Sequence, residues 1–535
     1  MNPTEPATQA PATVLAYHHS TKHRFERYAA GPEALDWSSQ PDPFRRFQDA
    51  PRVPLPLSAD RLATPYAALA RPDGAPPRPF SLEAIGAFLE LSLGISAWKQ
   101  FGPDRWALRC NPSSGNLHPT EGYLLCQGVP DLADGAYHYL SLDHSLERRG
   151  LCDSAPDGPQ RVWVALSSIH WREAWKYGER AFRYCQLDTG HAIGALRYAA
   201  AALGWRLRWL DGVGSAELAA LLGLDRGGDF RGAEPEEPEL LLELVQGPDC
   251  GAEPPRAPRE WSGRANRLDP HPMYHWPVID EVAAASRIPG GRRLEAPETD
   301  DQPPLPGLCQ IPAADLIRQR RSAQRFDRRR VLDAAAFYRI LDALLPRAGV
   351  APFDAWPDSP RLHPVLFVHR VEGLAPGLYA LPRRAGITDA LRAAMNAEFE
   401  WAKPEGCPAR LPLFRLLEGD GGKASKAIHC HQAIAADCAF ALGMLAEFEA
   451  RVTDTPWRYR QLYWEAGLLG QALYLEAEAQ GVRGTGIGCY FDDAFHELLG
   501  LEGRAFQSLY HFTVGFPLAD ARILTQPPYA GRGGE

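Results

Sequence analysis

Two polar segments have the residue types and spacing that suit the binding of a phosphorylated or otherwise polar molecule. In residues 109–119, Pro112 and Pro119 oppose helix formation, while Ser, Gly and Asn between them favour a turn that exposes backbone N–H groups. Residues 318–326 place the hydroxyl of Ser322 among four arginines, an arrangement that suits a phosphate. The plainer alternatives are an ordinary loop before a strand and a solvated basic face.

An internal repeat divides the sequence into two similar parts. Residues 188–224 align without gaps on residues 465–501, so that Gly190 stands opposite Gly467 and both copies end in Leu-Leu-Gly-Leu. Upstream, a Leu-His-Pro triplet ahead of a Leu-x-x-Gly-x-Tyr motif also occurs in both copies. Because the copies are too long for a solenoid repeat, we expect two homologous domains that pack as a pseudo-symmetric dimer within the chain.

The hydrophobic pattern predicts the elements that position these segments. A helix over residues 81–98, with Ser81 as its N-cap, precedes the first polar loop. A long apolar helix over residues 184–203 ends at Gly204. Strands are expected at residues 123–126, 161–167 and, after a turn at 132–135, up to Tyr139.

These elements and the repeat predict three parts of the chain. Residues 1–247 form a first domain, residues 309–535 form a second domain, and residues 248–308 form a linker rich in Pro, Gly and Arg. The linker is expected to contain a short helix near residues 279–286. It is expected to pack on the body through Trp261, Tyr274 and Trp276.

Composition and charge exclude several classes of protein. The chain has 535 residues, 45% of them hydrophobic, and a net charge of −9, so it is long enough for several domains and lacks the basic excess of a nucleic-acid scaffold. We recognise no signal peptide or membrane-spanning run, and ten scattered cysteines without a Cys-x-x-Cys pair are typical of reduced thiols, so we expect a cytoplasmic protein. We expect no metal site, since the neighbouring His, Cys and His of residues 429–431 point in different directions.

Beyond these patterns, the sequence resembles the FMN-dependent nitroreductase superfamily, and more closely its SagB-type branch, the azoline oxidases of peptide natural-product pathways. Residues 320–326 resemble the Arg-Arg-Ser-x-Arg-x-Phe phosphate loop of the family, with Gln324 in place of the last arginine and Arg325 as its substitute. Residues 112–119 resemble the Pro-Ser-x-x-Asn-x-Gln-Pro loop, which in the family reaches the flavin across the dimer interface.

Two further segments of the second copy resemble the same family. Residues 484–489 resemble the glycine-rich segment beside the isoalloxazine ring, where missing side chains let backbone amides approach the flavin. Residues 515–522 resemble the terminal segment whose basic residue closes on the phosphate. The resemblance implies an α+β, nitroreductase-like fold, in which a central antiparallel-rich sheet is flanked by helices, present in two copies that form an intrachain pseudo-dimer.

The resemblance implies FMN as the cofactor, and a comparison of the two copies predicts one FMN per chain. Arg361 stands in the second copy where Asn116 stands in the first, and residues 209–211 of the first copy are Trp-Leu-Asp where the second has Gly-Ile-Gly. The two copies together therefore keep one complete set of flavin contacts. An alternative is a second flavin in the degenerate site, held by His19, Ser20, Lys22 and Arg24. The residues expected to bind the single FMN are Pro112, Ser113, Ser114, Asn116, Arg320, Arg321, Ser322, Gln324, Arg325, Glu465, Gly486, Ile487, Gly488 and Arg522.

An adjacent Lys-Tyr pair is the expected catalytic centre, because the segment around Lys176 and Tyr177 resembles the azoline-oxidase segment in which such a pair serves the reaction. Oxidation of an azoline removes a proton from the ring carbon, and a lysine whose pKa is lowered by desolvation, or a tyrosine, is suited to take it. The alternative is a surface lysine beside a packed tyrosine. His118, His191 and Glu465 are further candidates; a histidine before a proline suits a structural role, and a carboxylate suits a helix N-terminus.

The sequence therefore predicts an FMN-dependent oxidoreductase, a dehydrogenase or oxidase of an azoline or related dihydro-heterocycle in a peptide or natural-product pathway, with oxygen as electron acceptor. The expected partners are a small-molecule or modified-peptide substrate and biosynthetic partner enzymes, with no nucleic acid and no membrane. Two alternatives stay open: an NAD(P)H-dependent nitro or quinone reductase, and a non-catalytic scaffold in a biosynthetic complex.

Overall fold

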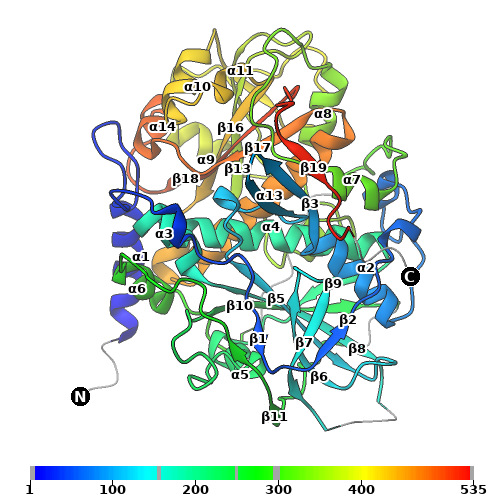
Figure 1. Ribbon diagram of the computed structural model, residues 1–535. Helices are drawn as coiled ribbons and strands as arrows, with labels where there is room; N and C mark the ends of the chain where they lie inside the picture. Colours follow the sequence, from blue (N-terminus) through cyan, green and yellow to red (C-terminus); the bar gives the residue numbers. More distant parts are fainter. Residues whose placement is uncertain (1–5, 154–157, 248–250, 293–301, 531–535) are drawn as a thin grey trace.

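The computed structural model describes residues 6–153, 158–247, 251–292 and 302–530. These residues form two halves stacked one on the other, with helices α4 (Ala181–Ala202) and α13 (Arg458–Ala479) packed together between them (Figure 1). Nearly every residue of both helices is buried. Because these helices are covered on all sides, they carry apolar residues all round instead of along one stripe.

Each half contains an antiparallel sheet, and the two sheets have the same strand order. Seven strands of the eight-stranded first sheet lie in the order β11 (Glu260–Trp261), β7 (Ser145–Leu151), β6 (Gly135–Leu140), β5 (Thr120–Gln127), β8 (Arg161–Ser168), β10 (Glu237–Val245), β9 (Arg206–Trp209), and β2 (Arg52–Pro54) pairs with β7. The second sheet has the order β15 (Phe414–Glu418), β14 (Gly377–Ala380), β13 (Leu362–Val368), β16 (Phe440–Glu447), β18 (Phe506–Gly515), β17 (Arg483–Ile487). From β7 to β9, as from β15 to β17, the strands are the third, second, first, fourth, sixth and fifth along the chain.

The central strands are apolar along their whole length because both faces of each sheet are covered. All seven residues of β13 are buried, and so are the first seven of β5. On one face of the first sheet, Leu218 and Leu222 of α5 (Ser215–Leu222) pack with Tyr123 and Trp163 of the strands. The expected α+β class, with antiparallel sheets flanked by helices, is confirmed.

A third, small sheet joins a hairpin of the first half to a strand near the end of the second half. The hairpin of β3 (Ile95–Phe101) and β4 (Asp104–Arg109) belongs to the first half, and β19 (Leu524–Gln526) from the end of the second half pairs with β3. The register places Leu524 opposite Gln100 and Gln526 opposite Trp98. Figure 1 shows β3 and β19 side by side next to the second half, so this sheet connects both halves at one edge.

Two aligned glycines meet where α4 and α13 cross. A Cβ added at Gly190 would lie 2.8 Å from the Cα of Gly467 and 2.2 Å from the carbonyl oxygen of Trp464. A Cβ added at Gly467 would lie 2.1 Å from the carbonyl oxygen of Leu187. The crossing therefore requires glycine in both helices, and equivalent residues of the two halves contact each other, as they do at a two-fold axis.

The other elements surround these sheets and helices. They are α1 (Pro6–Ser20), β1 (Phe47–Gln48), α2 (Leu82–Ser92), α3 (His170–Tyr177), β12 (Arg264–Ala265), α6 (Pro277–Ala285), α7 (Ala313–Gln319), α8 (Ala334–Asp342), α9 (Ile387–Ala394), α10 (Gly422–Ile428), α11 (Ile434–Asp437), α12 (Glu449–Asp454) and α14 (Asp492–Leu499), with short 3-10 turns between them. Within the described ranges, each helix is too short or too polar to cross a bilayer.

Most of the predicted elements are present, with one clear error. The predicted strands correspond to β5, β6 and β8, and the long apolar helix to α4. Ser81 does cap α2, because its side chain accepts a hydrogen bond from the N–H of Ala84. The predicted helix to residue 98 is wrong, since α2 ends at Ser92 and the residues from Ile95 pair with β4 as a strand.

The segment predicted to be a linker is joined to the first half where it is described. It contains the expected short helix, α6, and its strand β12 pairs with β1. The indole of Trp261 lies against Gly223 of the first half. Residues 248–250 and 293–301 lie outside the described residues, and the domain boundaries stay a prediction.

Candidate functional site

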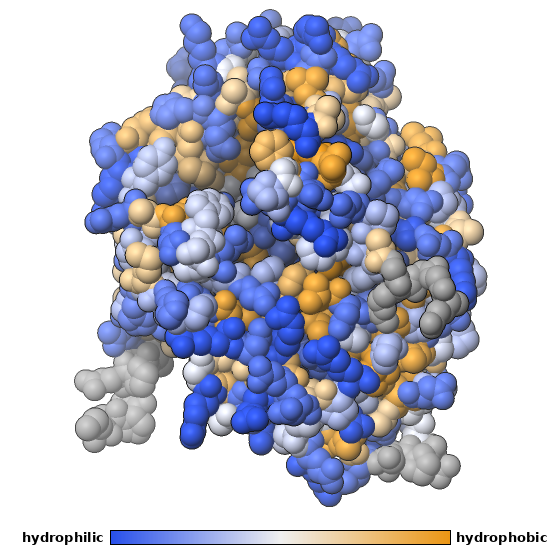
Figure 2. All heavy atoms as spheres, viewed as in Figure 1, coloured by the Kyte–Doolittle hydropathy of each residue, from blue (hydrophilic) through white to orange (hydrophobic). Residues whose placement is uncertain are grey.

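A cavity of about 760 Å³ lies between the two halves and is lined by both. A volume in this range suits a cofactor or a drug-sized ligand. The first half contributes the β3–β4 hairpin, the loop of residues 112–118 and Tyr177 at the end of α3; the second half contributes residues 319–324, β17 and residues 517–525. Figure 2 shows mixed hydrophilic and hydrophobic side chains over the face on which β3 and β19 lie.

One wall of the cavity carries a cluster of positive charge. Lys99, Arg320, Arg321 and Arg483 all line it. Burial, then the charges of Arg320 and Arg483, lower the pKa of Arg321 to about 10, while burial, then Arg321 and Arg483, lower the pKa of Lys99. The buried Nε of Arg320 has no hydrogen-bond partner in the described residues. Mutual repulsion and an unpaired donor are the properties of a site that takes an anion such as a phosphate.

A hydroxyl and a carboxylate complete this wall. The Ser322 Oγ lies 2.8 Å from the Tyr474 hydroxyl, and Arg483 pairs with Glu478 at 3.0 Å. Lys99 donates to the Thr525 Oγ1 at 2.6 Å, which connects β3 to β19. One carboxylate, on Glu478, therefore faces several cations, and the wall keeps an excess of positive charge.

The loop of residues 112–118 forms the opposite part of the lining and has a tight backbone. Gly115, Asn116 and His118 all have positive φ, of 59°, 60° and 54°. The strained turn is stabilised by side chains: Asn116 Nδ2 donates to the carbonyl of Ala107 at 2.9 Å, and Ser113 Oγ accepts from the N–H of His118 at 2.8 Å. Pro112, Ser113, Ser114 and Asn116 all line the cavity, as the sequence predicts.

A buried carboxylate that the sequence reasoning did not place in the site stands behind this loop. Asp188 of α4 lines the cavity and accepts hydrogen bonds from the N–H and the Oγ of Ser114, each at 3.0 Å. Burial raises the pKa of Asp188 to about 7, although the hydroxyls of Ser113 and Ser114 oppose the shift. Glu173 of α3 is fully buried, and burial, then the charge of Asp188, raise its pKa well above the usual range.

The structure separates the two members of the predicted catalytic pair. Tyr177 lines the cavity, and its hydroxyl lies 2.5 Å from the place where a Cβ of Gly115 would be, so the loop needs glycine there. Burial, then the charge of Glu173, raise the pKa of Tyr177, which keeps the phenol protonated. Lys176 is not among the residues that line the cavity; its Nζ lies 5.8 Å from the centre of the Trp37 ring and 5.3 Å from that of Tyr177.

The glycine-rich segment also lines the cavity, but its glycines serve a different purpose from the expected one. The N–H of Gly486 donates to the Tyr474 hydroxyl at 3.1 Å. A Cβ at Gly486 would lie 1.8 Å from the hydroxyl of Tyr510, and one at Gly488 would lie 2.2 Å from the ring of Tyr184. The missing side chains therefore make room for two tyrosines, which themselves line the cavity. Ile487, which stands between the two glycines in the sequence, also lines the cavity.

Three of the residues predicted to bind the cofactor do not line the cavity. Glu465 lies in the second half at the position equivalent to Asp188, where it accepts from the N–H of Arg361 and pairs with Arg383 at 2.6 Å. Arg325 is exposed, and the Arg522 side chain is 74% exposed and pairs with Asp520. The role of these three residues in cofactor binding stays a prediction, whereas Gln324, Arg320, Arg321 and Ser322 do line the cavity.

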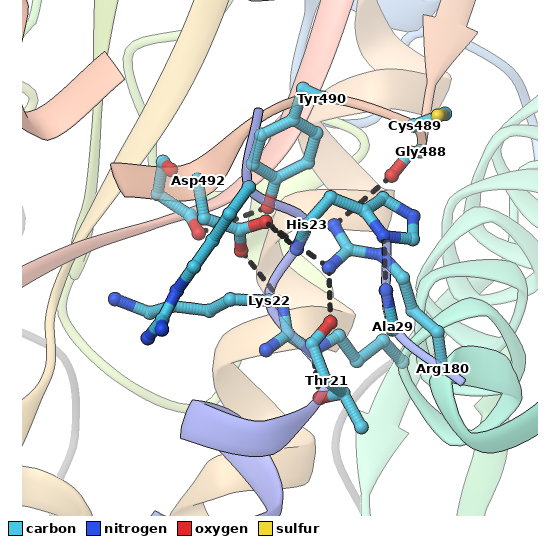
Figure 3. Close-up of polar contacts among 12 residues, drawn as sticks. Thr21, Lys22, His23, Ala29, Arg180, Gly488, Cys489, Tyr490 and Asp492 are labelled. Atoms are coloured by element: carbon cyan, nitrogen blue, oxygen red, sulfur yellow. Dashed lines mark hydrogen bonds and ion pairs between the residues drawn. The ribbon is translucent and has the colours of Figure 1, made fainter. Parts of the chain in front are cut away.

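The basic segment near the N-terminus, which offered an alternative site for a second flavin, is paired with a carboxylate of the second half. Lys22 and Arg24 both pair with Asp493, at 2.7 and 3.0 Å, and the N–H of His23 donates to Asp492 (Figure 3). These two aspartates begin α14, so the segment docks on the second half. Asp493 therefore pairs with two cations, and Asp492 also pairs with Arg180 and Arg183, so these ion pairs leave an excess of positive charge.

Several lining residues went unrecognised in the sequence. Lys99 lies outside every motif, Arg483 directly precedes the glycine-rich segment and Asp188 begins the repeat, and the tertiary fold brings all three to one cavity. The repeat did carry a signal for Asp188, because it aligns with Glu465 and both are carboxylates inside apolar helices. In the described residues no group of three His, Cys, Asp or Glu could hold a metal ion, and His429 instead contacts His511 at 2.9 Å.

Comparisons with known proteins agree with this architecture. Residues 317–516, in the second half, match the sequence model of the nitroreductase family. A crystal structure of a candidate nitroreductase from Anabaena variabilis superposes with a TM-score of 0.68 at 20% identity, covering 95% of this chain and 99% of that chain. The nitroreductase-like fold therefore extends over nearly the whole chain, which confirms the predicted fold.

Two weaker likenesses complete the comparison. A candidate nitroreductase of Methanocaldococcus jannaschii is 24% identical over 139 residues, and the alignment spans 66%, just under two thirds, of that relative's length and 24% of this chain. A chain of the Escherichia coli microcin synthetase McbBCD complex with truncated pro-MccB17 is 18% identical and covers 45% of this chain and 94% of that chain. Its TM-score of 0.27 is too low to support a functional comparison.

Proposed function

We propose that this chain is an FMN-dependent oxidoreductase that binds one FMN in the cavity between its halves. The observation that supports the proposal most strongly is the cluster of Lys99, Arg320, Arg321 and Arg483, which is drawn from both halves and carries an unpaired buried Arg320 Nε. Such a cluster suits the doubly charged phosphate of FMN. The cavity volume and the polar loop on its other side suit the rest of the cofactor.

The residues proposed to hold FMN come from the two halves. Arg320, Arg321 and Ser322, with Lys99 and Arg483, would bind the phosphate. The loop of Pro112, Ser113, Ser114 and Asn116 and the segment Gly486, Ile487 and Gly488 would contact the ring system. When bound, FMN supplies hydride acceptance, the chemistry that no amino-acid side chain provides.

The residues around the ring region are suited to handle a proton. With a pKa of about 7, Asp188 is partly ionised at neutral pH and is a competent base. The protonated hydroxyl of Tyr177 offers a hydrogen bond to a substrate in the same cavity. The Nζ of Lys176 lies 5.3 Å from the centre of the Tyr177 ring and adds positive charge there. We propose that Tyr177 and Asp188 bind and deprotonate the substrate, with Lys176 in support.

The proposed substrate is an azoline or related dihydro-heterocycle in a peptide or natural product, with oxygen as electron acceptor, as in SagB-type azoline oxidases. The support is the Lys-Tyr pair of the sequence and the position of Tyr177 at the cavity. The modified peptide and other biosynthetic enzymes are the proposed partners, and the cytoplasm is the proposed location.

We also propose that the two halves arose by tandem duplication and form an intrachain pseudo-dimer with one working site. The equal strand order and the facing Gly190 and Gly467 support this. Asp188 and Glu465 each accept a hydrogen bond from a loop N–H of their own half. In the second half, however, Arg383 forms an ion pair with Glu465, which supports the loss of the second flavin site.

A product assay tests the proposed function. The FMN-loaded chain is mixed in air with a thiazoline-containing peptide, and the product is followed by mass spectrometry together with hydrogen peroxide. We expect loss of two hydrogen atoms per ring and one peroxide per ring. Tyr177→Phe is expected to lower turnover by about 10-fold, in the range of one lost hydrogen bond to the substrate, and Lys176→Ala by less. Rapid bleaching of the flavin by NAD(P)H without any azole product would instead support the nitro or quinone reductase.

A further inference from the structure

Two cysteines that are far apart in the sequence meet at the edge of the cavity. The Sγ atoms of Cys430 and Cys489 lie 2.6 Å apart, closer than unbonded sulfur atoms normally pack, and both thiols are free and partly exposed. Cys489 directly follows the glycine-rich segment and lines the cavity, whereas Cys430 follows α10. The pair is therefore open to a small molecule and close enough to form an S–S bond with little movement.

The backbone holds Cys430 toward its partner. Cys430 and His431 both have positive φ, of 52° and 60°, which is rare for two consecutive residues that are not glycine. Two residues after Cys430, Gln432 Nε2 donates to the carbonyl of Cys489 at 3.2 Å and fixes the two segments to each other. Strain of this kind persists where the surrounding structure imposes it, and it is concentrated at functional sites.

The residues around Cys489 stabilise a thiolate. His23 Nδ1 accepts a hydrogen bond from the N–H of Ala29, so its proton is on Nε2 and is available to the sulfur (Figure 3). Arg180 donates to the carbonyl of Gly488 at 3.2 Å and brings its positive charge close to the sulfur. Hydrogen bonds from Cys430 and His23, then the charge of Arg180, lower the pKa of Cys489 against the effect of burial. The same contact raises the pKa of Cys430.

The two cysteines thus have different roles available to them. A thiolate is the nucleophile in thiol–disulfide exchange, and a protonated neighbouring thiol is the group that resolves the mixed disulfide. A shared metal ion fits less well, because zinc–sulfur bonds of about 2.3 Å keep two ligand sulfurs much farther apart than these. The described residues also contain no third ligand in a metal-binding arrangement.

We propose that Cys430 and Cys489 form a redox-active dithiol site that reduces low-molecular-weight disulfides and closes to an intrachain disulfide. The Cys489 thiolate attacks one sulfur of the disulfide, forms a mixed disulfide and releases one thiolate. Cys430 then gives its proton to the first released thiolate and attacks the sulfur of Cys489, which forms the intrachain S–S bond and releases the second thiolate. Two protein thiols are oxidised to one disulfide while one small disulfide is reduced to two thiols.

Thiol mapping tests this proposal on the full chain, with or without FMN. The pre-reduced protein is incubated with oxidised glutathione, quenched with iodoacetamide, digested and examined by mass spectrometry. We expect a Cys430–Cys489 disulfide and release of two glutathione thiols per closed pair. The proposal would be overturned if glutathione were found on other cysteines while Cys430 and Cys489 were both alkylated. Because this measurement uses the wild-type chain, it does not depend on whether a variant folds.

Variants separate the two roles. Cys430→Ser is expected to trap glutathione on Cys489 and to release one thiol instead of two. Cys489→Ser is expected to lose both steps, with at least a tenfold slower release of glutathione. Cys407→Ser is the matched control, because Cys407 is also partly exposed but contacts carbonyl oxygens and no other cysteine, and it is expected to behave like wild type. If Cys430→Ser traps no glutathione, Cys489 is not the nucleophile.

Discussion

At the scale of single residues, the site depends on what surrounds each carboxylate. Asp188 and Glu465 occupy equivalent positions in the repeat, yet Glu465 is paired with Arg383, whereas Asp188 accepts hydrogen bonds from Ser113 and Ser114. An ion pair keeps a buried carboxylate charged, whereas burial without a cation raises its pKa. Burial raises the pKa of both carboxylates, and in Glu465 the charge of Arg383 opposes the shift, so the same position holds an ion pair in one half and a carboxylate bonded to serines in the other.

The raised pKa of Asp188 predicts opposite effects of one substitution on stability and on turnover. Between the unfolded pKa of about 4 and the folded pKa of about 7, the folded state binds a proton that the unfolded state has released, so stability falls as pH rises through this window. Asp188→Asn removes this penalty while keeping an acceptor for Ser114. We expect it to raise the free energy of unfolding at pH 8 by about 4 kcal/mol, and by less at pH 5, as measured by urea denaturation.

The same variant should lose the rise of activity with pH. In the wild type, the base form of Asp188 accumulates as pH increases through about 7, so turnover should rise there. Asp520→Asn is the control, because Asp520 also lines the cavity but is paired with Arg522 near the surface. An Asp188→Asn protein whose stability differs from wild type equally at pH 5 and pH 8 would contradict the assigned pKa.

At the scale of elements, the two halves are held together by the crossing of α4 and α13. The helices approach closely because Gly190 and Gly467 face each other, and the nearest atoms to a new side chain are backbone atoms that cannot turn away. The exchange of β19 into the β3–β4 sheet adds a second connection at the edge. Both contacts hold the cavity walls of the two halves in a fixed position relative to each other.

Gly190→Ala tests the helix crossing. Alanine favours helix by about 1 kcal/mol over glycine, but overpacking against backbone costs about 1–3 kcal/mol, and the contact of 2.2 Å argues for the upper end. We expect a net loss of about 1–2 kcal/mol in urea denaturation, and a similar loss for Gly467→Ala. Gly227→Ala, where a Cβ meets nothing within 4 Å, should stay within about 0.5 kcal/mol of wild type. Equal stability of Gly190→Ala and Gly227→Ala would contradict the account.

The elements also show what sequence reasoning can and cannot reach. Local patterns gave the cap at Ser81, the buried strand β5 and most of α4, because those depend on nearby residues. They missed the end of α2, since an apolar run from Ile95 fits a helix as well as a strand until β4 pairs with it. Among the site residues, the loops were found by motif, but Lys99 and Arg483 required the tertiary fold.

At the scale of the whole molecule, two halves of one fold share one cavity. Each half supplies groups that the other lacks: the second half supplies most of the positive wall, and the first half supplies the tight loop, Tyr177 and Asp188. The equivalent position in the second half is filled by the ion pair of Glu465 and Arg383. The division of groups between the halves is the central claim, and it requires one cofactor where a symmetric dimer of this fold would have two.

The ratio of FMN to chain tests this claim most directly. The purified chain is saturated with FMN and freed of excess by gel filtration, and the flavin released by acid is measured by absorbance against the protein concentration. We predict one FMN per chain. A ratio of two would contradict the single-site account, because it would require a second flavin where Arg383 and Glu465 now pair, and a ratio of zero would contradict the assignment of the cavity to FMN.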